Sequence, residues 1–259
     1  MKTIIANWKM NVGVRESVAL ARGTLLTLRG RKVSPALVIC PPFVALSEVR
    51  KIVARSSAGL GAQNMFWEQS GAYTGETSPR MLLELGVSHV ILGHSERRAL
   101  FGETDEMVNK KVLQALEQKL VPIICVGESA DQRREGQTQQ VVRDQLMTAL
   151  QGVRLKSSES IMVAYEPLWA IGSGVAATVS DVIETHRFIH SLLAQVFEQA
   201  LPGQVSVLYG GSVDAENAYG FLREDEVNGV LVGGASVKIN QFKGIVQAAA
   251  EVLEAKQTS

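Results

Sequence analysis

Short apolar runs alternate with longer amphipathic segments along the whole chain. In the longer segments, among them residues 106–119, 139–150, 181–199 and 240–254, apolar side chains return every three or four positions, the period of a helix with one buried face. The short runs are nearly continuous in apolar residues, as in parallel strands that are covered on both faces. Eight such runs occur, at Thr3–Asn7, Ala36–Cys40, Gly59–Gln63, His89–Gly93, Val121–Val126, Ile161–Tyr165, Val205–Tyr209 and Gly229–Val232.

The repeated strand–helix pattern predicts an α/β protein with a closed parallel barrel. Eight units in 259 residues give roughly 32 residues for each unit, close to the size typical of a (β/α)8 barrel. We expect one domain, residues 1–259, because composition does not divide the chain into parts of different character. The alternative is an open, doubly wound sheet of eight strands. A dinucleotide-binding sheet of that kind needs a glycine-rich first turn, and residues 7–11 contain no glycine, which favours the barrel.

Composition and charge exclude several classes of protein. Hydrophobic residues make up 46% of the chain, and Lys plus Arg balance Asp plus Glu at 26 each, so no global field attracts nucleic acid or an acidic membrane. No apolar stretch is long enough to span a bilayer, and no basic leader precedes the first run. Cys40 and Cys125 lie in apolar runs, which suits buried thiols of a reducing compartment. We therefore expect a cytoplasmic protein without nucleic-acid or membrane contacts, in which any anion site is local.

Polar residues stand at the ends of several predicted strands, where barrels carry their reactive groups. The first run ends in Asn7 and Lys9, whose side chains point the same way because strand side chains alternate. A single lysine is most often a solvated surface residue. A functional role for Lys9 is therefore indicated only in combination with the polar residues at the other strand ends. A Schiff-base role for Lys9 is also conceivable.

Histidines occur in two different contexts. His94 follows Gly93 at the end of the fourth run, where Ser95 can cap a helical turn whose positive end keeps the imidazole neutral. A histidine with a purely structural hydrogen bond is the alternative for His94. His186 and His190 are four residues apart on a predicted helix, but no third ligand accompanies them, so we expect surface residues and no metal site.

Glu166 places a carboxylate directly after the sixth run. The segment that follows is stiff at Pro167 and contains Gly172 and Gly174, a composition typical of a hinged lid beside a proton-transfer group. A surface glutamate that leads a helix is the simpler alternative. A positioned carboxylate that is removed from water can instead act as a base that takes a proton from carbon.

Glycine-rich turns follow the seventh and eighth runs. They read Tyr209-Gly210-Gly211-Ser212 and Val232-Gly233-Gly234-Ala235-Ser236. Because glycine lets backbone N–H groups approach an anion closely, and barrels bind phosphate at these two strand ends, the pair predicts a phosphate ester as substrate.

Five motifs at five strand ends, taken together, resemble the triosephosphate isomerase family. They are Asn7-Trp8-Lys9-Met10-Asn11, Gly93-His94-Ser95-Glu96-Arg97-Arg98, Ala164 to Gly172, Tyr209 to Ser212 and Leu231 to Ala235, and the resemblance runs from residue 4 to about residue 250. It implies a single TIM barrel that interconverts dihydroxyacetone phosphate and D-glyceraldehyde 3-phosphate through an enediol(ate), in glycolysis and gluconeogenesis, with no metal or organic cofactor.

The resemblance also implies roles for individual residues. Glu166 resembles the base, and His94 the neutral electrophile that polarises the carbonyl. Lys9 and Asn7 resemble the groups that stabilise negative charge, with Glu96 beside Lys9. The phosphate is expected against Gly172, Ser212, Gly233 and Gly234.

A homodimer is implied as well. In it the long irregular segment Asn64 to Thr77 inserts into the partner, with Tyr73, Thr74 and Gly75 reaching the partner's region around Asn11 and Lys9. The chain departs from the family pattern in Ser173 to Ala177, which lack the usual lysine of the lid. This departure affects lid contacts and leaves the catalytic groups in place.

Two other functions fit parts of the pattern. A phosphate-binding aldolase would use Lys9 as a Schiff base, although such a lysine normally stands at a later strand end. A barrel that only binds a phosphorylated ligand would not need the carbon-acid base that Glu166 offers.

Overall fold

A computed structural model describes residues 2–171 and 177–257 and shows a closed barrel of eight parallel strands in chain order. Neighbouring strands pair throughout, and β1 closes the barrel against β8 with Thr3 opposite Gly229 and Ala6 opposite Val232. The strands are β1 Thr3–Asn7, β2 Ala36–Cys40, β3 Gly59–Ala62, β4 His89–Leu92, β5 Val121–Val126, β6 Ile161–Tyr165, β7 Val205–Tyr209 and β8 Gly229–Val232. The predicted (β/α)8 barrel is confirmed, and the open sheet is excluded.

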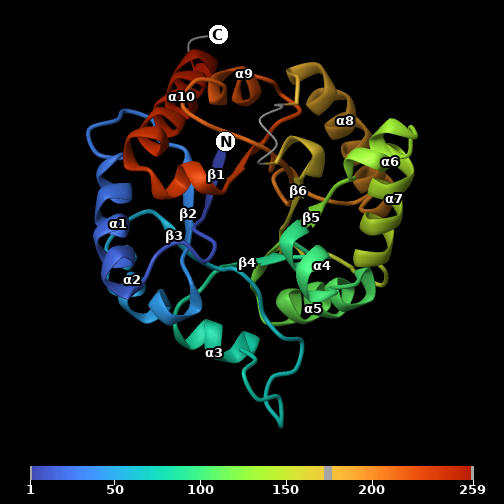
Figure 1. Ribbon diagram of the computed structural model, residues 1–259, viewed down its shortest axis with the longest axis horizontal. Coiled ribbons are helices and arrows are strands. Elements are labelled where there is room, and N and C mark those ends of the chain that lie inside the picture. The colour runs from blue at the N-terminus through green and yellow to red at the C-terminus, as the bar shows by residue number, and fades with distance from the viewer. Residues whose placement is uncertain (1, 172–176, 258–259) are drawn as a thin grey trace.

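Helices surround the strands on all sides (Figure 1). They are α1 Val14–Leu26, α2 Leu46–Val53, α3 Pro79–Glu84, α4 Ser95–Phe101, α5 Asp105–Glu117, α6 Ala130–Arg134, α7 Thr138–Ala149, α8 Val179–Val196, α9 Ala218–Leu222 and α10 Ile239–Gln257, with short 3₁₀ turns η1 Phe43–Ala45, η2 Leu168–Ala170 and η3 Gly234–Val237. The four helices expected from periodicity all occur, with ends that differ by no more than three residues. No helix of the described residues is both long and apolar enough to cross a membrane.

The hydrophobic core has an outer layer between strands and helices and an inner layer inside the barrel. Alternate residues of each strand belong to different layers: Ile4 and Ala6 pack outward, whereas Ile5 points into the barrel. The inner layer consists of Ile5, Val38, Cys40, Ile91, Ile123, Cys125, Ala164, Leu208 and Leu231. Both cysteines are fully buried free thiols, as their apolar runs predict.

This alternation fixes which residues face the mouth of the barrel. Two positions after an inward residue, the next side chain again points toward the barrel axis. Ile5 is thus followed by Asn7, Ala164 by Glu166, Leu208 by Gly210 and Leu231 by Gly233. The candidate chemistry therefore collects at the carboxyl ends of the strands.

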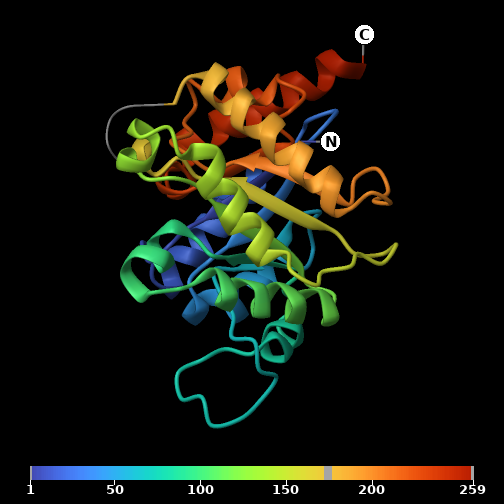
Figure 2. The same ribbon diagram turned by 90° about the vertical axis from the view of Figure 1, so that its right-hand side faces the viewer.

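The segment between β3 and α3 projects from the body of the barrel (Figures 1 and 2). Its base is closed by the hydrogen bond from Phe66 N–H to Thr77 O, and the Phe66 ring stacks on Trp67 and makes a tilted contact with Tyr73. The tip residues Tyr73, Thr74 and Gly75 are exposed. The long irregular segment predicted from the sequence is confirmed.

The expectation of surface histidines at positions 186 and 190 is wrong for His186. Its side chain is fully buried on α8, and Nδ1 lies 3.1 Å from the carbonyl oxygen of Glu226, which His190 Nε2 also contacts at 3.0 Å. The helix turns this face inward against the loop before β8, where a histidine finds a backbone acceptor. In the part of the chain that the structure describes, no cluster of His, Cys, Asp and Glu could hold a metal ion.

Candidate active site

A cavity of about 360 Å³ opens at the carboxyl ends of the strands and collects the polar strand ends described above. Charged, polar and glycine residues from β1, β4, β6, β7 and β8 meet in it. Its lining consists of Asn7, Lys9, His94, Glu166, Ile171, Gly210, Gly211, Ser212, Val213, Asp214, Leu231, Gly233, Gly234, Ala235 and Lys238. Residues that are far apart in the sequence thus share one small space.

Glu166 is held in place by backbone donors and acceptors. Its side chain is only 2% exposed, and its Oε2 accepts a hydrogen bond from the backbone N–H of Ser95 at 2.9 Å. Its own N–H donates to Val126 O at 2.7 Å, which continues the β5–β6 ladder. A buried carboxylate needs such partners because desolvation of an unpaired charge is costly.

Two glycines make room for Glu166. A Cβ on Gly127 would lie 1.8 Å from the Glu166 carbonyl oxygen, and a Cβ on Gly210 would lie 2.9 Å from Glu166 Cγ. Both distances are inside van der Waals contact, so a larger residue at position 127 would push the Glu166 backbone and one at position 210 would push its side chain. The glycine after β7 therefore serves Glu166 as well as the expected anion.

His94 caps helix α4, one position earlier than expected. Its Nδ1 accepts a hydrogen bond from the backbone N–H of Glu96 at 3.2 Å, whereas Ser95, which we expected to be the cap, is the first helical residue. Because Nδ1 accepts, the ring proton belongs on Nε2, which lies 3.1 Å from Glu166 Oε1. The imidazole is then a neutral donor aimed at the cavity.

Lys9 projects into the cavity from a left-handed backbone conformation, with φ of 51°. Its Nζ forms an ion pair with Glu96 Oε1 at 2.6 Å, and its N–H donates to Asn7 Oδ1 at 3.1 Å. Gln63 Nε2 donates to the Lys9 carbonyl oxygen at 2.9 Å. Lys9 is thus fixed from three sides, which argues against an idle surface lysine.

The glycine turns after β7 and β8 complete the lining of the cavity. Ser212 donates from Oγ to Ala170 O at 2.6 Å, and this contact ties the β7 turn to the segment after Glu166. A Cβ on Gly233 would lie 3.1 Å from Lys9 Cε, while a Cβ on Gly234 would meet open space. Gly172 and residues 173–176 of the expected lid lie outside the described residues.

Sequence reasoning missed two groups that support the site. One is the Ser95 N–H, because a backbone donor leaves no mark in the sequence. The other is Glu128, which follows β5, is fully buried and accepts hydrogen bonds from Tyr165 Oη at 3.0 Å and Trp169 Nε1 at 2.9 Å. Burial, reinforced by the Glu128 charge, raises the pKa of Tyr165 well above its usual value. The rule that polar residues end barrel strands could have identified Glu128.

The candidate dimer residues lie on the surface of the chain. Asn11 is exposed, its Nδ2 donates to Trp8 O at 2.8 Å, and neighbouring Met10 is 95% exposed. Tyr73 is 45% exposed at the tip of the projecting segment. Met10 and Tyr73 thus offer exposed apolar side chains near the residues expected at the interface.

Comparison with known proteins relates the chain to one family. The family model described as triosephosphate isomerase matches residues 2–249. A triosephosphate isomerase of Thermoanaerobacter pseudethanolicus is 47% identical over 243 residues, which cover 94% of this chain and 97% of the relative. Those of Alkaliphilus metalliredigens and Dictyoglomus turgidum are 46% and 43% identical over 246 residues, covering 95% of this chain and 98% of each relative.

Proposed function

The chain belongs to the triosephosphate isomerase family, and from that premise we propose how its residues interconvert dihydroxyacetone phosphate and D-glyceraldehyde 3-phosphate in glycolysis. The reaction moves one proton between two adjacent carbons and one between their oxygens. It therefore needs a base at carbon, a donor at oxygen and a holder for the phosphate.

Glu166 is the base. It removes the proton from the carbon next to the carbonyl, and the electrons of that C–H bond form the carbon–carbon double bond of an enediolate while the carbonyl π electrons move to the oxygen. The same carboxyl then returns the proton to the neighbouring carbon, where a new carbonyl forms at the other oxygen. The observation that carries this role is the buried Glu166 carboxylate, 3.1 Å from His94 Nε2 and in one cavity with Lys9. A positioned carboxylate base contributes roughly 10² to 10⁴ in rate.

His94 is the neutral donor to the oxygens. Nδ1 accepts a hydrogen bond from the Glu96 N–H, which supports a proton on Nε2. His94 can give this proton to one oxygen of the enediolate and recover a proton from the other oxygen. Lys9 and Asn7 stabilise the developing negative charge, and the Glu96 carboxylate keeps Lys9 in position.

The glycine turns hold the phosphate. Ser212, Gly233 and Gly234 line the same cavity as the base, and their backbone N–H groups would bind the phosphate, since glycine allows close approach. This arrangement puts the charged end of the substrate at β7 and β8 and its reacting carbons near Glu166.

The assembly and setting of the enzyme follow from the same premise. We propose that residues 1–259 form one catalytic domain, and that two copies associate through Tyr73, Thr74 and Gly75 against the partner's surface around Asn11. Met10 and Tyr73 supply the exposed apolar area that such an interface would bury. A glycolytic step also places the enzyme in the cytoplasm.

The proposal is tested by coupling conversion of glyceraldehyde 3-phosphate to the oxidation of NADH by a dehydrogenase specific for dihydroxyacetone phosphate. Glu166→Ala should lower turnover by about 10²- to 10⁴-fold while the fold, followed by circular dichroism, is retained. Turnover like that of the wild type in this variant would defeat the assignment of the base. Borohydride trapping with substrate should leave no adduct on Lys9, because an adduct would support the aldolase alternative.

A further inference from the structure

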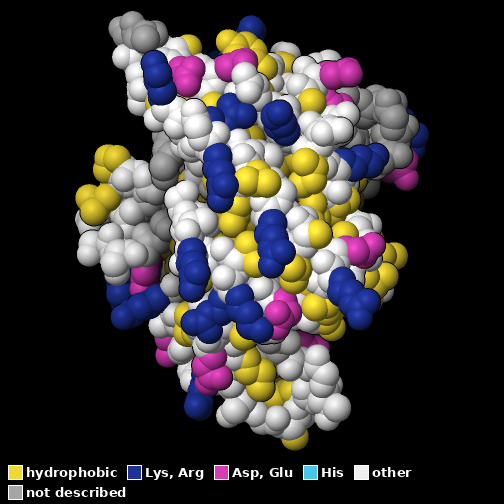
Figure 3. Space-filling view, turned by 90° about the vertical axis from the view of Figure 1, so that its left-hand side faces the viewer, with side chains coloured by type: hydrophobic (Ala, Val, Ile, Leu, Met, Phe, Trp, Pro, Cys, Tyr) yellow, Lys and Arg dark blue, Asp and Glu magenta, His cyan; other side chains and the backbone are white. Residues whose placement is uncertain are grey.

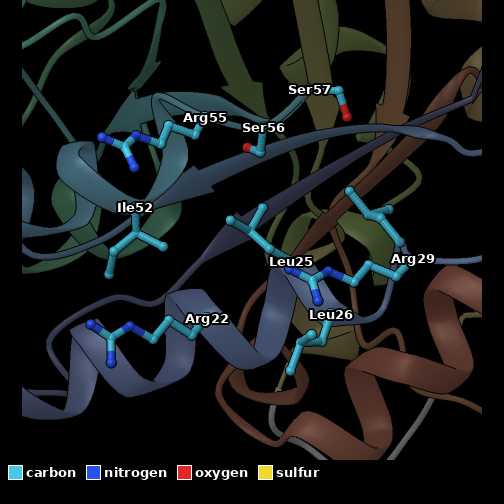
Figure 4. Close-up of a pocket in the computed structure, with 9 residues that line it drawn as sticks. Arg22, Leu25, Leu26, Arg29, Ile52, Arg55, Ser56 and Ser57 are labelled. Carbon is cyan, nitrogen blue, oxygen red and sulfur yellow. The ribbon is translucent and has the colours of Figure 1, made fainter.

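A second concave surface lies on the outside of the barrel, between α1 and the end of α2 (Figure 4). This groove has a volume of about 610 Å³. Its floor is aliphatic and its rim is basic. The lining residues are Arg22, Leu25, Leu26, Leu28, Arg29, Ile52, Arg55, Ser56 and Ser57.

The groove shares no lining residue with the active-site cavity. Helix α1 follows β1 and leads back to the start of β2, so its last turn lies toward the amino ends of the strands. The cavity opens at the carboxyl ends. The reaction proposed above therefore leaves the groove unused.

The lining residues of α1 lie on one face of the helix. Arg22, Leu25 and Leu26 of α1 are spaced by three and four positions, the spacing of one helical face, and Arg29 lies in the turn that follows the helix. Leu26 is 55% exposed, so a large part of this apolar side chain stays in contact with water in a groove that Arg22 and Arg29 also line. Leu25 and Ile52 are half-buried and pack against the outer core.

The three rim arginines are unpaired. Within residues 2–171 and 177–257, the guanidinium groups of Arg22, Arg29 and Arg55 make no hydrogen bond or ion pair, although Arg97, Arg98 and Arg133 all pair with carboxylates elsewhere. Unpaired arginines in a shaped apolar groove are ready to receive carboxylate or phosphate groups in their fork geometry.

The surrounding surface is basic as a whole. Residues 14–57 contain eight Lys and Arg against two Glu, in a chain whose net charge is zero. Figure 3 shows that face of the molecule, with Lys and Arg side chains spread among hydrophobic ones. The field over the groove therefore favours an acidic ligand with apolar parts.

We propose that this groove docks a short acidic, amphipathic segment of a partner protein. Apolar side chains of the segment cover Leu25, Leu26 and Ile52, and carboxylates on either side pair with the three arginines. Arg22 lies on α1, Arg29 in the turn after α1, and Arg55 just after α2, so the three guanidinium groups come from three different segments. Because the arginines surround aliphatic lining residues, we expect an occupant with more than one negative charge and with apolar groups between the charges.

Two other polyanions fit less well. Single-stranded nucleic acid binds through aromatic platforms, and none of the groove's lining residues is aromatic. A membrane surface needs apolar side chains that protrude into it, whereas these leucines line a hollow. A peptide can place its side chains inside the groove.

The test uses a fluorescein-labelled peptide in which Leu and Glu repeat with helical period, titrated with the full chain and followed by anisotropy. We expect saturable binding that weakens about tenfold or more in Arg22→Glu and Arg55→Glu and also weakens in Leu26→Ser. Arg15→Glu is the matched control, since Arg15 is exposed on the same helix but does not line the groove, and it should bind nearly as the wild type does. Isomerase activity and thermal midpoint should stay unchanged in all four variants.

The proposal is overturned if the groove variants and Arg15→Glu weaken binding equally, because general charge would then suffice. It is also overturned if a peptide with Ser in place of Leu binds as tightly, or if a single-stranded RNA or an anionic phospholipid vesicle binds more tightly than the peptide in a way that Arg22→Glu abolishes. Since activity is read separately, the docking proposal can fail while the proposed catalytic roles stand.

Discussion

His94 Nε2 lies 3.1 Å from Glu166 Oε1, although the two residues follow different strands of the barrel. Backbone groups fix both partners: the Glu96 N–H directs His94 Nδ1, and the Ser95 N–H directs the other oxygen of Glu166. The first turn of α4 therefore orients an acid–base pair through main-chain donors alone. Changes in this turn should act on catalysis without removing a reactive side chain.

Replacing Ser95 by proline tests the backbone donor. The variant removes the N–H that binds Glu166, while proline is well tolerated at the first position of a helix and the preceding His94, with ψ of 140°, already has the conformation that proline requires. A hydrogen bond to a charged group contributes about 1.5 to 3 kcal/mol, so we expect kcat to fall about ten- to a hundredfold. Ser95→Ala keeps the N–H and should retain nearly full turnover in the same coupled assay. Equal activity in the two variants would exclude a positioning role for the N–H.

Substitutions at Lys9 separate its charge from its backbone conformation. Lys9→Gly and Lys9→Ala both remove the ammonium group, so each should lower kcat/KM by about 10²-fold or more. Glycine adopts the left-handed conformation freely, whereas alanine does not, so Lys9→Gly should be about 1 kcal/mol more stable than Lys9→Ala. Urea unfolding at one protein concentration measures the difference. A more stable alanine variant would contradict the strain argument.

His186 should make the fold sensitive to acid. Burial lowers its pKa from 6.5 to about 4, so between these values the unfolded chain binds a proton that the folded chain does not. The free energy of unfolding should consequently fall as pH falls through this window, and the contribution is fully present above it. Between pH 7 and pH 5 the loss should be about 2 kcal/mol smaller in His186→Gln than in the wild type.

Urea titrations of both proteins at each pH check this expectation. Burial also lowers the pKa of His89 to about 4. His89 remains in the variant, so part of the dependence of the unfolding free energy on pH should be preserved. Identical pH slopes in the two proteins would show that His186 does not contribute to the acid sensitivity.

Thr74→Arg should weaken the proposed homodimer. The residue is exposed at the tip of the projecting segment, and a new charge would have to be buried in a partner's surface. We expect sedimentation to show dissociation at protein concentrations where the wild type remains dimeric. Leu201→Arg places the same charge at an exposed position outside the projecting segment and should leave association unchanged. A monomeric wild type would refute the interface outright.

The strands were predictable because parallel strands covered on both faces leave continuous apolar runs. All eight were located, and only β3 and β4 end one residue early, before Gln63 and Gly93. Gln63 turns its amide to Lys9 O and Cys40 O, a contact that depends on the neighbouring strand and so has no local signal. The strand ends then indicated Asn7, Lys9, His94 and Glu166, which the structure brings into one cavity.

The rest of the site depends on contacts between distant segments. Ser95 acts through its N–H, which every residue except proline possesses, and the need for Gly127 arises only where Glu166 passes over it. A surface position was expected for His186 because no third metal ligand accompanies it and His190, yet the residue is buried against the loop that carries Glu226. Each of these contacts depends on two segments that are far apart in the sequence. Neither segment by itself carries a pattern that identifies its partner.

The pairing of β1 with β8 also has a consequence for biosynthesis. Lys9 is translated near the beginning and Gly233 near the end, and the two become neighbours only when the last strand joins the first. A nascent chain on the ribosome therefore contains Lys9, His94 and Glu166 before it contains the turn after β8 that is proposed to bind the phosphate. Premature termination before β8 should yield fragments with no affinity for the triose, so the cell gains activity only from chains that are nearly finished.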